Sequence, residues 1–142
     1  LKDGSKKMSK SELSDLSRIN LTDTQDEIIN KIKKAKTDPM PMPSTIKELD
    51  ERLEAKNLVG IYSSLSNSSL DNTVNEFSGK NFSEFKVKLS QVVVDKINPI
   101  SLEIKKLLND KEYLDKIVSD GCKVADEIAS QKIKKIHEIV GF

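Results

Sequence analysis

The chain has 142 residues and 36% hydrophobic content, so it is long enough for one domain with a single core but too short for two ordinary domains. Its 24 Lys and Arg residues nearly balance its 23 Asp and Glu residues, and the net charge of +1 excludes a general attraction to nucleic acid or membranes. Its one cysteine, Cys122, excludes an intrachain disulfide and favours a reducing, cytoplasmic location.

Residues 1 to 20 are rich in Ser, Lys and Asp, which predicts a flexible loop followed by a short turn. This segment contains the pentamer Lys7-Met8-Ser9-Lys10-Ser11. Lysine ammonium groups on long stems, together with serine hydroxyls and backbone N–H groups, can wrap a chain of phosphates. A polar loop in a highly charged chain can also contain these residues without any such role, and the pentamer alone leaves both interpretations open.

The segment from Thr22 to Lys36 is predicted to be an amphipathic helix. Thr22 or Asp23 can cap it, and acidic residues follow in the first turn. One face carries the apolar residues Ile28, Ile29, Ile32 and Ala35, and the other is expected to carry Lys31, Lys33, Lys34 and Lys36. The lysines form either a basic stripe for nucleic-acid phosphates or a solvated face near a helix C-terminus, and we favour the solvated face.

A proline-rich linker, residues 38–43, separates this helix from the next, for which Ser44 is a predicted cap. A second helix is expected from Thr45 to about Ser66, and a short third one from Leu70 to Phe77.

A long helix is predicted from about Ser83, with a kink or break at Pro99. Its apolar pattern resumes after the proline and stops at Asn109, where Asp110 can cap the last helical segments. No segment shows convincing strand periodicity, so we predict an all-α fold: a helical bundle of about five or six helices preceded by a flexible loop.

Outside the pentamer the chain offers little chemistry. The single histidine, His137, has no neighbours at a spacing typical of a catalytic triad, and Cys122 lies on an apolar stripe. The sequence lacks the paired Cys or His residues that would predict a zinc site, and no apolar run is long enough to span a bilayer.

The stretch Asp3-Gly4-Ser5-Lys6-Lys7-Met8-Ser9-Lys10-Ser11 resembles the KMSKS loop of class I aminoacyl-tRNA synthetases and its approach segment. The pentamer is followed by Glu12-Leu13, where the family commonly has Asp-Pro. Further stretches, spread over the whole chain, are similar to the C-terminal part of bacterial-type tryptophanyl-tRNA synthetases: residues 31–38, 57–62, 82–86, 98–100 and 121–142.

This resemblance implies an enzyme that activates tryptophan with ATP, accompanied by Mg²⁺, and transfers it to its tRNA. It implies that Lys7 and Lys10 are catalytic, that Met8, Ser9 and Ser11 help them to bind ATP, and that Lys132, Lys134 and Lys135 are candidates for tRNA contact. It also implies a homodimer. Residues 1–20 would end a nucleotide-binding domain, and residues 21–142 would form the helical bundle of anticodon-binding type.

The chain begins at Leu1, and a phosphate loop needs a partner surface, so we expect it to be the C-terminal part of a longer protein and to be inactive alone. Two alternatives come from other classes. One is a stand-alone helical interaction module whose Lys/Ser-rich N-terminus is disordered; the other is a nucleic-acid binder without catalysis, which the neutral overall charge disfavours.

Overall fold

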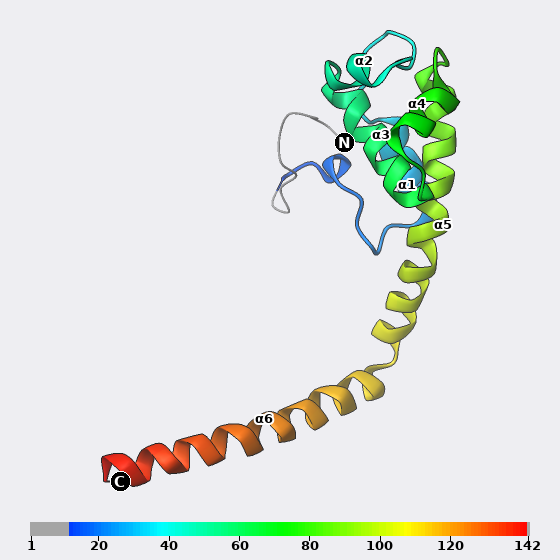
Figure 1. Cartoon of the computed structure of the whole chain (residues 1–142). Coiled ribbons are helices and arrows are strands. Elements are labelled where there is room, and N and C mark those ends of the chain that lie inside the picture. Colours follow the sequence, from blue (N-terminus) through cyan, green and yellow to red (C-terminus); the bar gives the residue numbers. More distant parts are fainter. Residues whose placement is uncertain (1–11, 142) are drawn as a thin grey trace. The chain divides into compact units, whose positions relative to one another are not determined.

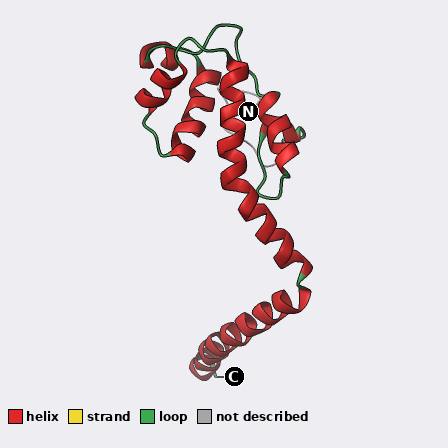
Figure 2. Ribbon diagram, turned by 90° about the vertical axis from the view of Figure 1, so that its right-hand side faces the viewer, coloured by secondary structure: helices red, strands yellow, loops and turns green. Residues whose placement is uncertain are grey.

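A computed structural model of the protein describes residues 12–141, and within this range the chain is all-α (Figures 1 and 2). The described residues form a short 3-10 helix, η1 (Asp15–Ser17), and six α-helices: α1 (Gln25–Lys33), α2 (Ile46–Asp50), α3 (Leu53–Ser66), α4 (Leu70–Phe77), α5 (Phe82–Asn109) and α6 (Lys111–Val140). The predicted fold class is therefore confirmed. None of these helices is long and apolar enough to cross a membrane.

The chain divides into two compact units, Leu1–Leu102 and Glu103–Phe142, with the division inside α5. In the first unit α3 packs against α4, and α2 contacts both. The centre of its core is an aromatic cluster in which Phe77 makes edge contacts with Tyr62 and Phe85 at centroid distances of 5.0 and 4.9 Å. The fully buried side chains around this cluster include Ile28, Ile32, Leu49, Leu58, Val59 and Leu89.

The helix starts differ in detail from those predicted. Thr24, rather than Thr22 or Asp23, caps α1, because Thr24 and Glu27 form a reciprocal capping box. Thr45, rather than Ser44, accepts a hydrogen bond from the backbone of Glu48 at the start of α2. The helix expected from Thr45 to Ser66 is two helices, α2 and α3, whereas α4 has the predicted bounds.

Helix α5 is not broken at Pro99. A proline has no N–H to donate to the carbonyl four residues earlier, which here belongs to Asp95. Asp95 lies on an exposed part of the helix, where water can hydrogen bond this carbonyl in place of the missing donor. The free-energy cost of the hydrogen bond lost at Pro99 is therefore compatible with a continuous helix.

The second unit consists of the end of α5 and of α6. The Asp110 side chain caps α6 by accepting a hydrogen bond from the Tyr113 backbone N–H at 3.1 Å, as predicted. Gly141 ends it in the left-handed conformation, with its N–H donating to the His137 carbonyl. No residue of α6 is buried.

Candidate functional site

The predicted ATP-binding residues Lys7, Met8, Ser9, Lys10 and Ser11 lie outside the described residues. The described chain begins at the next position, Glu12. The structure therefore shows how the chain leaves the pentamer.

Short hydrogen bonds fold residues 12–20 onto themselves. The Ser17 hydroxyl donates to the Ser14 carbonyl at 2.9 Å, and the Arg18 guanidinium donates to the Glu12 carbonyl, also at 2.9 Å. Arg18 forms a 3.1 Å ion pair with Asp15 as well. The turn predicted after the pentamer therefore exists, as the 3-10 helix η1 with the backbone contacts around it.

Lys31 joins this segment to α1. Its Nζ lies 2.5 Å from the Asp15 Oδ2 and 2.7 Å from the Asp23 Oδ2. The Lys31 side chain is 4% exposed and that of Asp23 is 7% exposed, whereas that of Asp15 is 53% exposed. A buried ammonium is stable only when its hydrogen bonds and charge are compensated, and two carboxylates provide that here.

Asn20 completes the cluster. Its backbone N–H donates to the Asp23 Oδ2 at 2.8 Å, and its side-chain amide donates to Asp15 and to Asp23 at 3.0 and 3.2 Å. We call Asp15, Asn20, Asp23 and Lys31 the exit cluster, because they hold the chain where it leaves the pentamer.

The placement of Lys31 corrects the sequence analysis, which put it on the solvated face with Lys33, Lys34 and Lys36. Residues 28, 31, 32 and 35 follow the i, i+3, i+4, i+7 spacing of a single helical face, so Lys31 belongs with the apolar residues. This spacing was the sequence signal that could have predicted the burial of Lys31, and with it the exit cluster. The other three lysines are exposed, as expected.

Contacts within the exit cluster shift the pKa values of Lys31 and Asp15. Burial lowers the pKa of Lys31, but the hydrogen bonds and charges of Asp15 and Asp23 outweigh it, so that this pKa is raised above its ordinary value. The hydrogen bonds from Lys31 and Asn20 hold the pKa of Asp15 below its usual value. Lys31 and Asp15 are therefore charged at neutral pH.

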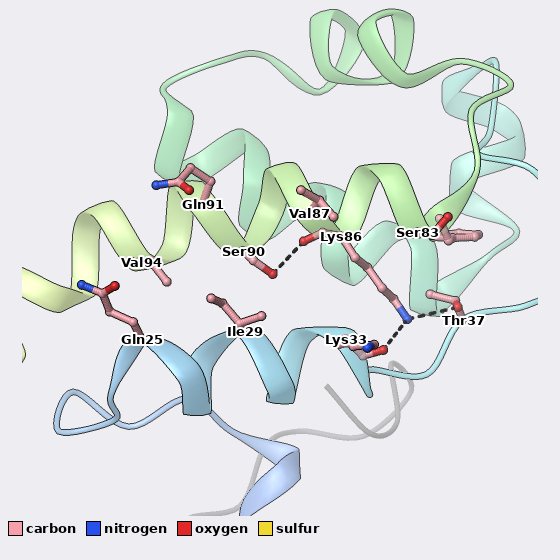
Figure 3. Close-up of a pocket in the computed structure, with 11 residues that line it drawn as sticks. Gln25, Ile29, Lys33, Thr37, Ser83, Lys86, Val87, Ser90, Gln91 and Val94 are labelled. Carbon is pink, nitrogen blue, oxygen red and sulfur yellow. Dashed lines mark hydrogen bonds between the residues drawn. The ribbon is translucent and has the colours of Figure 1, made fainter.

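A groove with a volume of about 640 Å³ runs between α1 and α5, within the first unit (Figure 3). Lys86 of α5 reaches across its end and donates to the Ala35 carbonyl at 2.6 Å, the Lys33 carbonyl at 3.3 Å and the Thr37 hydroxyl at 3.4 Å. This ammonium caps the C-terminus of α1, where carbonyl groups lack helical partners.

Burial lowers the pKa of Lys86. Its three N–H donors already have three acceptors, so it has none to offer to a phosphate in the groove. We therefore assign Lys86 to the fold rather than to ligand binding. Among residues 12–141, no group of His, Cys, Asp or Glu side chains is arranged to hold a metal ion.

The candidate tRNA-contacting residues Lys132, Lys134 and Lys135 are exposed on α6. Lys132 and Lys135 are three positions apart and share one face, whereas Lys134 points away from Lys132. The structure therefore places two of the three side by side.

Comparison with known proteins identifies relatives of the whole chain. A family model described as tRNA synthetases class I (W and Y) matches residues 1–98. The tryptophan–tRNA ligases of Mesorhizobium japonicum and Agrobacterium fabrum are each 48% identical to the chain over all 142 residues, and that of Caulobacter vibrioides is 45% identical. The chain covers 40% of the length of the first two relatives and 41% of the third, so it spans about two fifths of each.

Proposed function

Since the chain belongs to the class I tRNA synthetases of the tryptophan and tyrosine group, we propose that it is the C-terminal part of a tryptophan–tRNA ligase. The observation that carries this proposal is that the phosphate-loop pentamer occurs in a chain similar throughout its length to tryptophan–tRNA ligases. The resemblance inferred from the sequence stretches agrees with these comparisons.

In the proposed reaction, the tryptophan carboxylate attacks the α-phosphorus of ATP, and the bond to the pyrophosphate breaks. Negative charge accumulates on the leaving pyrophosphate, and two ammonium groups close to it stabilise the transition state more than bound ATP. We assign this role to Lys7 and Lys10. Ser9, Ser11 and the Met8 backbone then help to hold ATP, which arrives with its Mg²⁺.

The tryptophanyl group is then transferred to the terminal adenosine of the tRNA. We propose that residues 1–20 end the nucleotide-binding domain and that residues 21–142 form a helical domain of anticodon-binding type. Lys132, Lys134 and Lys135 are its candidate phosphate contacts, since exposed lysines bind nucleic-acid backbones. We further propose that the full-length ligase is a cytoplasmic homodimer.

The decisive experiment changes Lys7 and Lys10 to Ala in the full-length protein and measures tryptophan-dependent ATP–pyrophosphate exchange. Loss of one charged donor to a transition state typically costs about 100-fold or more in rate, so we expect each single variant to lose at least roughly that much. Lys34→Ala is the matched control, because Lys34 is exposed and lies at the end of α1. Full exchange activity in the double variant would refute the assignment.

A further inference from the structure

The exit cluster contains a buried charge that the proposed chemistry does not use. Lys31 shares a helix face with the buried residues Ile28 and Ile32, where an apolar side chain would pack without the cost of desolvating an ammonium. A buried ion pair is therefore weak evidence for stability alone, and its geometry is better examined for what it positions.

The two carboxylates bound by Lys31 lie at the two ends of the connection between the pentamer and α1. Asp15 lies in η1, near the start of the described chain, and Asp23 immediately precedes the Thr24 cap. One ammonium therefore fixes both ends of residues 15–23, and Asn20 bonds both carboxylates from the middle.

The exit cluster lies close to the pentamer along the chain. Asp15 is four residues after Ser11 in the sequence, and the described chain begins at Glu12, the residue that follows the pentamer. The contact between Arg18 and the Glu12 carbonyl involves the residue next to the pentamer. The exit cluster and the Arg18 contact therefore hold the described chain directly after the pentamer.

We propose that Lys31, through its ion pairs with Asp15 and Asp23, is a positioning residue that fixes the exit of the Lys7–Ser11 loop against α1. This inference rests on the proposed function, since it concerns the loop to which catalysis was assigned. Lys31 acts on the reaction only through the placement of Lys7 and Lys10. Through Lys31, helix α1 holds the residues that directly follow the loop.

Asp15 offers the cleanest variant. Asp15→Asn removes the loop-side carboxylate, which is half exposed, and leaves the buried pair between Lys31 and Asp23 to maintain the fold. A second variant, Lys31→Met with Asp23→Asn, removes both buried charges together, so that neither is left unpaired. Asp26→Asn is the matched control, because Asp26 is an exposed acid in the first turn of α1.

The test measures ATP–pyrophosphate exchange by the full-length protein and the unfolding temperature of each variant. We expect Asp15→Asn and the Lys31→Met/Asp23→Asn variant to lower kcat roughly 10- to 100-fold, since a small misplacement of catalytic groups has effects of this size. The KM for tryptophan should stay within about twofold of the wild-type value, as should the kcat of Asp26→Asn.

The same changes are then made in a Lys7→Ala/Lys10→Ala background. If the exit cluster acts through Lys7 and Lys10, these substitutions should change the residual exchange rate of the Lys7→Ala/Lys10→Ala protein by less than about twofold. An equal loss in both backgrounds, or no loss of kcat in the first, overturns the inference. If the loss of Lys7 and Lys10 is itself without effect, the proposed function fails instead, so the two failures are distinguishable.

Discussion

At the scale of single residues, Arg52 connects segments of the first unit that no local pattern joins. Its guanidinium binds Asp38 through two parallel hydrogen bonds, from Nε at 2.9 Å and from Nη2 at 2.5 Å, and donates to the Pro41 carbonyl at 2.7 Å. It also lies 5.5 Å from the centre of the Phe82 ring. Burial raises the pKa of Asp38, but the bonds from Arg52 and the Met40 N–H outweigh it and hold this pKa below its ordinary value.

Replacing Arg52 by Met should lower the free energy of unfolding by about 2 kcal/mol, because a partly buried carboxylate and a carbonyl lose charged donors. Arg52→Lys should recover less than half of this loss, since an ammonium lacks the planar fork that binds both carboxylate oxygens. Chemical denaturation followed by near-ultraviolet circular dichroism, which reports on Tyr62 in the core, measures both effects.

Lys56→Met is the control for this prediction. Lys56 forms an ion pair of 2.7 Å with Asp50, but both side chains are about half exposed, and such surface pairs contribute little. If Lys56→Met and Arg52→Met destabilise the protein equally, the special contribution of the Arg52 contacts is disproved.

At the scale of elements, the start of α1 depends on Thr24. Its Oγ1 accepts a hydrogen bond from the Glu27 N–H at 3.3 Å, and the Glu27 carboxylate accepts one from the Thr24 N–H at 2.7 Å. Thr24→Ala should therefore destabilise the first unit by about 1 kcal/mol in denaturant unfolding. Thr22→Ala, two residues before the Thr24 cap, should have almost no effect, and a larger effect at Thr22 would show that the cap is misassigned.

The same helix shows what its sequence could and could not predict. The apolar spacing and acidic first turn predicted a helix here, but Thr22, Asp23 and Thr24 are all good caps. A local signal separates them, because Glu27 lies three residues after Thr24, at the spacing of a capping box. Asp23 is in addition engaged by Lys31, which the sequence pattern did not predict. The apolar face was predicted correctly at Ile28 and Ile32; Lys31, on that same face, was assigned by its charge rather than by its spacing and was therefore misplaced.

Other differences also arise from contacts between distant residues. The chain has no proline or glycine between α2 and α3, and the interruption lies at Arg52, whose side chain binds Asp38, 14 residues earlier. Lys86 caps α1 from about 50 residues away. Helix α4 was predicted with its observed bounds because its signals are local: a Ser69 cap at one end and Ser78-Gly79 at the other.

At the scale of the whole molecule, the buried apolar core lies between Ile28 and Val94, and α6 contributes no buried residue. Lys31, the buried ammonium of the exit cluster, binds Asp15 and Asp23 within the described chain. Under the proposed function, Lys7 and Lys10 act on a pyrophosphate that the remaining three fifths of such a ligase would hold in place. Charge stabilisation of this kind requires the reacting groups to be fixed close to the cations.

The isolated 142-residue chain should therefore show no tryptophan-dependent ATP–pyrophosphate exchange, whereas the full-length protein should exchange readily under the same conditions. The measurement is incorporation of labelled pyrophosphate into ATP, with and without tryptophan, at equal protein concentrations. Circular dichroism of the isolated chain should first show that its helices are formed, so that inactivity is not mistaken for unfolding. Exchange that depends on tryptophan would mean that these residues bind both substrates themselves, and the division of roles between the loop and the rest of the ligase would then be wrong.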